Sequence, residues 1–221
     1  MRNLAFVFVG VSLAAGVACA QGNDPDKVTA TGGVMVTGWQ GRIDPQAAKG
    51  GRNISQDKVV SMGSGFHVTS GPAAIYWNPA NTASGNYTVT GSFTQTKAPT
   101  HPEAYGLIIG GNDLTSANQS YYYFLVRGDG KYLINHRAND STVHKIVDWT
   151  ANPAIKAQDA DGKASNKLSI AVGPDKVSFM VNGVEVDSKP RSAIDPKGIA
   201  GIRVNHNLDV HVDGFAVTTV K

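Results

Sequence analysis

The chain has 221 residues, 20 lysines and arginines, 17 aspartates and glutamates, and a formal net charge of +3 at pH 7. Its basic residues are scattered and form no run, so the sequence shows no electrostatic footprint for nucleic acid. The only cysteine is Cys19, which excludes a disulfide framework and leaves stability to the hydrophobic core.

The first 20 residues have the pattern of a secretory signal peptide. Arg2 gives a basic start, residues 4–13 are an apolar run, and Ala18-Cys19-Ala20 is a small-residue cleavage sequence. The apolar run is too short to anchor the chain stably across a bilayer. Lipidation at Cys19 is the alternative, but Gly16 stands where a lipoprotein signal has a large aliphatic residue.

We therefore expect cleavage near Ala20 and a periplasmic or extracellular protein with no later membrane span. A flexible leader over 21–33 is expected, followed by one domain over 34–221, since about 200 residues suit a single large all-β domain.

Short strand-like segments follow one another along the rest of the chain, separated by clusters of Gly, Pro, Asn, Asp and Ser. Many short strands at near-regular spacing predict an all-β sandwich or barrel made of antiparallel sheet. Short helices are expected only over 44–48, 151–157 and 191–194. The expected strands cover 34–39, 58–62, 66–69, 74–77, 87–95, 105–109, 121–127, 131–137, 143–149, 167–172, 177–187 and 198–217.

Two hairpins allow the faces of their strands to be assigned. Asn182-Gly183 lies between alternating hydrophobics and predicts a type I′ turn, because both central residues of that turn need a positive φ. On this hairpin Val177, Phe179, Val181, Val184 and Val186 are expected in the core.

The second hairpin turns at Gly128-Asp129-Gly130. There the better core face has the side chains of Tyr122, Phe124, Val126, Tyr132 and Ile134. The opposite face then has a set of aromatic and polar side chains: Tyr121, Tyr123, Arg127, Asn135 and Arg137.

Six segments taken together resemble the concanavalin A-like lectin/glucanase superfamily. The resemblance spans roughly residues 60–217 and is strongest to secreted bacterial domains of the 3-keto-disaccharide hydrolase-like or laminin-G-like type. The segments are GFHVTSGPAAIYWNP (65–79), YTVTGSF (87–93), YGLIIGG (105–111), YYYFLVRGDGKYLINHR (121–137), NKLSIAVGPDKVSFMVNGVEV (166–186) and GIAGIRVNHNLDVHVDGFAV (198–217).

The resemblance implies a two-sheet antiparallel jelly-roll sandwich, a fold that hosts lectins, hydrolases and adhesion modules alike. The glucanases of the superfamily have a Glu-x-Asp-x-x-Glu strand. This chain departs from that pattern, because its only glutamates are Glu103 and Glu185 and neither begins such a motif. The paired carboxyls of a retaining glycosidase are therefore not carried over.

The first candidate site is the face with Tyr121, Tyr123, Arg127, Asn135 and Arg137. Sugars are bound by aromatic rings beneath their C–H faces and by planar side chains that hydrogen-bond their hydroxyls. We expect these five residues to bind an oligo- or polysaccharide. The alternative is an ordinary exposed sheet face, where Tyr and Arg are favoured strand residues.

The second candidate site lies in the stretch from Asn205 to Asp213. Read as one strand, it forms a polar row that could bind ligand, with the side chains of Asn205, Asn207, Asp209, His211 and Asp213 on one face. Asn205 and Asn207 could instead form a turn, since Asn tolerates left-handed backbone. In an enzyme, Asp209 would orient His211 as a general base, with Arg137 assisting.

Metal and cofactor signals are weak. No pair of histidines has a metal-site spacing, so no metal ligand is assigned and no cofactor is expected. Asp159-Ala160-Asp161-Gly162 resembles part of a calcium loop but lacks its closing Glu, which leaves a calcium ion only as an alternative. Trp39, Trp77 and Trp149 are expected to pack at the core or its edge; stacking of a glycan at the rim of the domain is the alternative for Trp77 and Trp149.

The sequence is compatible with three functions. A secreted carbohydrate-binding domain is favoured, because glutamates are almost absent. A sugar-acting hydrolase of the 3-keto-disaccharide type and a structural or adhesion domain of the cell envelope are the alternatives.

Overall fold

The computed structural model describes residues 30–220. The predicted signal peptide over 1–20, Cys19 and most of the predicted leader lie outside the described residues. No helix among the described residues is long and apolar enough to cross a membrane.

Strands make up most of the regular secondary structure among the described residues, as predicted. Besides strands there are only short helical segments, namely α1 (Pro45–Lys49), η1 (Ile54–Gln56) and η2 (Arg191–Ala193). The strands are β1 (Gly33–Val34), β2 (Gln40–Ile43), β3 (Lys58–Met62), β4 (Gly65–Thr69), β5 (Ala74–Ala83), β6 (Tyr87–Gln95), β7 (Ala104–Asn112), β8 (Ser120–Arg127), β9 (Lys131–Arg137), β10 (Val143–Ala151), β11 (Ala164–Val172), β12 (Lys176–Val181), β13 (Val184–Pro190), β14 (Gly198–Val204) and β15 (Asp209–Thr219).

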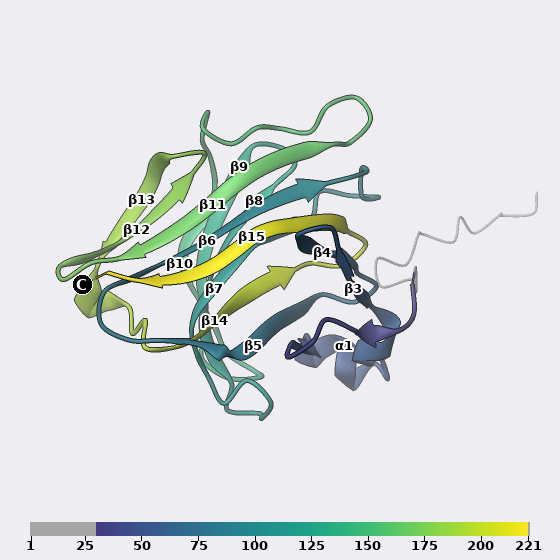
Figure 1. Cartoon of the computed structure of the whole chain (residues 1–221), viewed down its shortest axis with the longest axis horizontal. Helices are drawn as coiled ribbons and strands as arrows, with labels where there is room; N and C mark the ends of the chain where they lie inside the picture. The colour runs from purple at the N-terminus through teal and green to yellow at the C-terminus, as the bar shows by residue number, and fades with distance from the viewer. Residues whose placement is uncertain (1–29, 221) are drawn as a thin grey trace, which may run out of the picture.

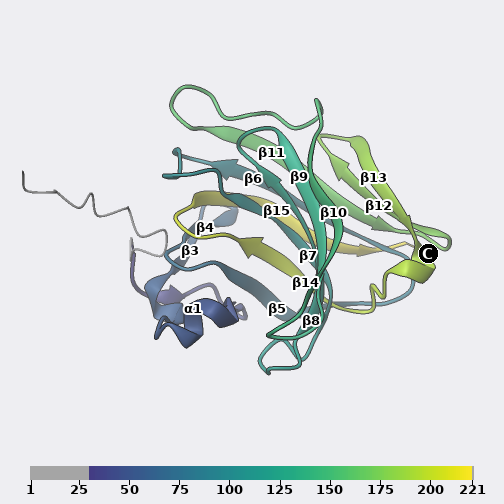
Figure 2. The same cartoon turned by 180° about the vertical axis from the view of Figure 1, so that it is seen from behind.

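These strands form two sheets that pack face to face (Figures 1 and 2). Sheet A has the order β1-β3-β4-β15-β6-β11-β12-β13, and sheet B has the order β10-β9-β8-β7-β14-β5-β2. All pairs are antiparallel except the short pairing of β1 with β3. The predicted all-β, two-sheet antiparallel sandwich is confirmed, and the helix α1 follows the edge strand β2, which pairs with β5.

The core lies between the sheets and follows the period-two pattern of the strands. Along β6, every second residue from Tyr87 to Gln95 is buried. The largest side chains of the core are aromatic; Phe93 stacks on Tyr105 at 5.5 Å and Phe124 packs on Phe179 at 5.3 Å between ring centroids. Burial of such rings is the main source of stability in a fold without disulfides.

The hairpin at Asn182-Gly183 is confirmed, with φ angles of 52° and 85° at its two central residues. The predicted core face is correct for Val177, Phe179 and Val181, which are fully buried. It is wrong for Val184, which is exposed. A register shift between Phe179 and Met180 changes the partners across the hairpin, so the alternation on β12 does not continue on β13.

The hairpin of β8 and β9 has no register shift, so its two faces are as predicted. The side chains of Phe124, Val126, Tyr132 and Ile134 are part of the core, and Tyr122 packs against it. Of the expected helices, those near 44–48 and 191–194 form, but 151–157 is a turn in which the Asn152 side chain accepts the N–H of Ala154.

Candidate functional site

The outer face of sheet B, away from the core, has a second cluster of buried apolar side chains. It includes Ile75, Trp77, Ile108 and Leu125, together with Leu114 from the loop between β7 and β8. The central strand β7 is consequently buried on both faces. This outer face is therefore packed, and it differs from the open solvent face that an antiparallel sandwich often presents.

The structure places all five predicted ligand-binding residues of the β8–β9 hairpin on this outer face. Tyr121 pairs in register with Arg137, and Tyr123 with Asn135. Tyr121 is only 1% exposed and Arg137 8% exposed. Tyr121 belongs to the buried apolar cluster, so its ring has almost no surface on which a sugar could stack.

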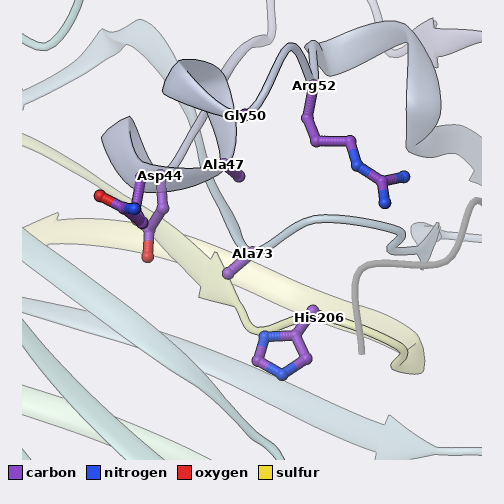
Figure 3. Close-up of a pocket in the computed structure, with 7 residues that line it drawn as sticks. Asp44, Ala47, Gly50, Arg52, Ala73 and His206 are labelled. Atoms are coloured by element: carbon purple, nitrogen blue, oxygen red, sulfur yellow. The ribbon is translucent and has the colours of Figure 1, made fainter. Parts of the chain in front are cut away.

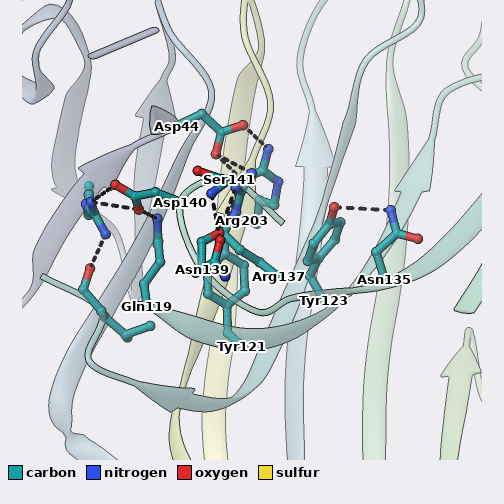
Figure 4. A network of polar contacts seen from close by, with 12 residues as sticks. Asp44, Gln119, Tyr121, Tyr123, Asn135, Arg137, Asn139, Asp140, Ser141 and Arg203 are labelled. Atoms are coloured by element: carbon teal, nitrogen blue, oxygen red, sulfur yellow. Dashed lines mark hydrogen bonds and ion pairs between the residues drawn. The ribbon is translucent and has the colours of Figure 1, made fainter. Parts of the chain in front are cut away.

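A polar network runs through this apolar surface and centres on Asp44 (Figure 4). Arg203 of β14 donates two hydrogen bonds to the Asp44 carboxylate, at 2.7 and 2.6 Å. Arg137 lies 3.5 Å from the same carboxylate and donates from Nε to the Tyr121 hydroxyl at 3.0 Å. Two arginines of the sheet thus fix a single carboxylate at the end of β2.

The charge state of Asp44 follows from these contacts. Burial alone would raise the pKa of Asp44, but the attraction and hydrogen bonds of Arg203, with the charge of Arg137, outweigh it and lower the pKa. Asp44 is therefore a carboxylate at neutral pH, and it is a hydrogen-bond acceptor only.

A pocket of about 440 Å³ opens beside Asp44 (Figure 3). Its polar groups come from Asp44 and Gln46 at α1, from Arg52 after α1, and from His206 in the turn between β14 and β15. The remaining lining residues are small: Ala47, Gly50 and Ala73. The volume falls in the range of roughly 300–1,000 Å³ that is typical of small-molecule sites.

Tyr123 and Asn135 continue the polar network away from the pocket. The Asn135 amide donates to the Tyr123 hydroxyl at 3.1 Å, and the guanidinium of Arg203 lies over the Tyr123 ring at 5.3 Å. Within the described residues, the buried Nε of Arg203 and Oδ1 of Asn135 have no hydrogen-bond partner. Buried polar atoms without a partner are uncommon in folded proteins.

Arg127 lies at the opposite end of β8 from Tyr121. Its guanidinium forms two hydrogen bonds with Asp129, at 2.8 and 2.6 Å, and stacks over the Trp149 ring at 4.2 Å. Trp149 packs at the edge of the outer apolar cluster, as expected for this residue. Arg127 is therefore tied to its own hairpin turn and lies outside the Asp44 network.

The loops at the other end of the face are fastened by Arg42 of β2. Arg42 donates to both carboxylate oxygens of Asp140 at 3.0 Å and to the carbonyl of Leu114 at 3.3 Å. Gln119 also donates to Asp140, at 2.6 Å. These bonds hold the loop with Leu114 against the sheet.

The predicted catalytic pair lies elsewhere. Val210 and Val212 of β15 point into the core, which turns Asp209 and His211 to the outer face of sheet A. Arg137 is on the outer face of sheet B, so the expected arrangement of Asp209, His211 and Arg137 in one site is wrong.

The expected contact between Asp209 and His211 is also wrong. Asp209 is hydrogen-bonded to His67 at 2.7 Å and accepts from Thr96 at 2.6 Å. His211 forms its ion pair with Asp213, at 2.9 Å. For Asp209, residues on β4 and directly after β6 thus take the place of the expected i, i+2 neighbour His211.

The turn interpretation of Asn205 and Asn207 is the correct one. Asn207 has a φ of 57° in the turn between β14 and β15, and Asn205 donates its N–H to the Ala104 carbonyl at 2.9 Å. Neither residue lines the Asp44 pocket, although their neighbour His206 does. In the stretch that resembles part of a calcium loop, the Asp159 carboxylate accepts the N–H groups of Asp161 and Lys163, as in an ordinary surface turn.

Sequence reasoning missed Asp44, Arg203 and His206. Arg203 did leave a signal, because it interrupts the apolar residues Ile202 and Val204 and so faces outward from the core. Asp44 was expected only as a helix start. The two residues are 159 positions apart, and no local pattern connects them.

No known protein family and no curated protein matches the chain by sequence. Among solved structures, the chain is similar to the carbohydrate-binding module CBM66 from Bacillus subtilis, with a TM-score of 0.59 and 13% identity, covering 84% of this chain and 98% of that one. It is also similar to a Bacillus subtilis protein of unknown function with a galectin-like fold, with a TM-score of 0.55 and 13% identity, covering 86% and 97%. At such low identity, these similarities establish the jelly-roll sandwich fold alone.

Proposed function

We propose that this protein is a secreted carbohydrate-binding domain whose ligand enters the Asp44 pocket and contacts the adjoining outer face of sheet B. The observation that supports the proposal most directly is the Asp44 carboxylate, fixed by two buried arginines at the wall of a pocket with polar groups from three parts of the chain. The similarity in fold to a carbohydrate-binding module adds support.

The chemistry of the pocket suits a sugar. Each hydroxyl of a sugar both donates and accepts hydrogen bonds, and Asp44 supplies a fixed acceptor while Arg52 and Gln46 supply donors. Because Arg203 and Arg137 hold the carboxylate in place, little side-chain entropy is lost when a ligand binds it. Ala47, Gly50 and Ala73 leave room for a ring of sugar size.

The roles of the predicted ligand-binding residues change in this proposal. Tyr121 and Arg137 position Asp44, and Tyr123 and Asn135 extend the surface beside it. We no longer expect Asn205 and Asn207 to contact ligand, since they form and flank a turn.

A sugar-acting enzyme of the 3-keto-disaccharide hydrolase-like type is the second candidate, and one observation favours it. His206 of the pocket contacts the buried carboxylate of Glu103 at 2.8 Å, a pairing that can transfer protons. The two glutamates cannot form a glycosidase pair, because Glu103 directly precedes β7 of sheet B and Glu185 lies on β13 of sheet A.

The test is a panel of neutral, acidic and oxidised oligosaccharides incubated with the purified protein, followed by mass spectrometry of retained and released sugars. We expect a sugar to be retained unchanged, and retention to fall in Gln46→Ala and Arg52→Ala. Lys49→Ala is the matched control, since Lys49 is exposed on the same helix and lies outside the pocket. A shortened product would establish that the protein is an enzyme. If no sugar were retained or cleaved, a structural or adhesion domain would be the remaining function.

A further inference from the structure

Three metal-binding side chains meet at one end of the outer face of sheet B. The Nδ1 of His101 and the Nε2 of His206 each lie 2.8 Å from the same oxygen of Glu103. One ligand atom from each of the three residues lies within 4.8 Å of the others, and the two imidazole rings are 5.1 Å apart between centroids. Among the described residues, this is the only group of three or more His, Cys, Asp or Glu residues with such spacing.

The fold holds the three residues together from distant parts of the chain. His101 and Glu103 are two positions apart in the segment that leads into β7, and the bend at His101 brings its ring into contact with the Glu103 carboxylate. His206 comes from the turn after β14, and the N–H of Asn205 donates to the Ala104 carbonyl at 2.9 Å, which fixes this turn against the start of β7.

Glu103 is the unusual member of the group. Its side chain is only 8% exposed, whereas those of His101 and His206 are 41% and 26% exposed. A buried glutamate requires partners, because an unpaired carboxylate away from water is strongly destabilising. Arg127, a cation whose charge acts on Glu103, is itself paired with Asp129, so the two histidines remain the direct partners of Glu103.

We propose that His101, Glu103 and His206 form a binding site for one divalent transition-metal ion of the zinc type. Two imidazoles and one carboxylate are a ligand set that zinc accepts, with metal–ligand distances of about 2.0–2.2 Å. Three atoms around a tetrahedral ion are farther apart than the 2.8 Å contacts here, so a modest spreading of these side chains accompanies binding. The ion takes the place of the protons shared between Glu103 and the two histidines.

The exposure of the two histidines leaves the fourth coordination position toward solvent, as in zinc sites that accept a ligand. His206 also lines the Asp44 pocket, so the metal would lie at its rim. The metal proposal does not rest on the proposed carbohydrate binding. Its experiment uses Zn²⁺ alone, so failure of one proposal can be told apart from failure of the other.

The experiment is titration of chelator-treated purified protein with Zn²⁺, by calorimetry, with elemental analysis of the dialysed product. We expect one Zn²⁺ per chain and at least tenfold weaker binding in His101→Ala, His206→Ala and Glu103→Gln. His211→Ala is the matched control, because His211 also pairs with a carboxylate, Asp213, but lacks a third ligand; we expect its affinity within twofold of wild type. Ca²⁺ should not bind, since it prefers ligands that are all oxygen.

Thermal unfolding shows whether a variant that loses Zn²⁺ binding is still folded. His101 is the most exposed of the three, so His101→Ala should fold, and Zn²⁺ should raise the Tm of wild type and of His211→Ala but not that of His101→Ala. Absence of saturable Zn²⁺ binding in wild type would overturn the proposal. So would a folded His101→Ala protein that binds Zn²⁺ as tightly as wild type.

Discussion

The outer faces of the two sheets each have a carboxylate at the centre of a polar cluster, but the surroundings of the two carboxylates differ. On sheet A, Asp209 takes hydrogen bonds from His67 and Thr96 and an ion pair from the exposed Lys97. On sheet B, Asp44 is held by Arg203 and Arg137, which are both nearly buried, and it lines a pocket.

The difference shows how a polar face becomes a site. On sheet A, the polar groups of the Asp209 cluster hydrogen-bond to their cross-strand neighbours, as expected for a solvated face. On sheet B, the loop with Leu114 and an apolar cluster exclude water around the arginines, so the same kinds of residues acquire fixed positions and stronger electrostatics. Polar side chains that hydrogen-bond one another, as around Asp209, stabilise the sheet. A carboxylate fixed beside a pocket, as Asp44 is, can bind a ligand.

The largest effect should come from Arg203→Met. It leaves Asp44 without its bidentate partner, and breaking a buried pair costs about 3–5 kcal/mol. The matched change on sheet A, Lys97→Met, removes an ion pair of a side chain that is 60% exposed and should cost less than about 1 kcal/mol. Urea unfolding measures both.

The double variant Asp44→Asn with Arg203→Met should recover part of the loss, because it removes both charges. An Arg203→Met protein as stable as Lys97→Met would contradict the assignment of a buried pair on sheet B.

The next effect concerns Asp57, a fully buried carboxyl in neither outer face. Burial raises its pKa from 3.8 to about 7, although hydrogen bonds from Tyr76 and Gly71 lower it. A raised pKa favours the protonated form in the folded state, so its contribution is fully present below pH 4 and is lost as the pH rises through 7. The full change corresponds to about 4 kcal/mol.

The variant Asp57→Asn removes this titration. The free energy of unfolding of the variant, minus that of wild type, should therefore rise by about 4 kcal/mol from pH 4 to pH 8, as measured by urea unfolding at each pH. A difference between the two proteins that stays constant with pH would show that Asp57 titrates normally.

Asp209 should respond to pH in the opposite direction. The hydrogen bond with His67, with those from Thr96 and Lys97, outweighs burial and lowers the pKa of Asp209. Its stabilisation is present above the ordinary pKa of 3.8 and is lost as the pH falls below that value. Asp209→Asn should cost about 1–2 kcal/mol at pH 7 and progressively less in acid; an equal cost at pH 3 and pH 7 would count against this ion pairing.

The smallest effect on stability should come from removing one tyrosine hydroxyl. Tyr123→Phe loses the hydrogen bond from Asn135, and Tyr132→Phe loses those to Val186 and Asp187. Each should cost about 0.5–1.5 kcal/mol in thermal unfolding. Only Tyr123→Phe should also weaken sugar retention. If both variants retained sugar equally well, the ligand would not contact the outer face of sheet B.

The fold was predictable because strands alternate with a strict period of two. This pattern placed Tyr122 and Phe124 inward and Tyr121 and Tyr123 outward, and the Asn-Gly dipeptide fixed the hairpin of β12 and β13. Val184 escaped the prediction because a register shift is set by both strands together and leaves no mark in the sequence of either.

The site was predictable in part. Alternation gave the outer face of sheet B, but that prediction took no account of the uninterrupted apolar run of Leu107, Ile108 and Ile109, which is the pattern of a strand buried on both faces. Arg203, which pairs with Asp44, lies on β14, and His206, which pairs with Glu103, lies in the turn after it. Such contacts depend on the strand order of sheet B, in which β14 lies beside β7 and β5.

The central claim is that the Asp44 pocket binds sugar, and calorimetric titration of the retained sugar into pocket variants tests it most directly. Gln46→Ala and Arg52→Ala should each weaken binding about tenfold, as the loss of one or two hydrogen bonds predicts. Lys49→Ala should bind the sugar as tightly as wild type. Equal affinity in all four proteins would contradict the account and place the ligand elsewhere on the sandwich.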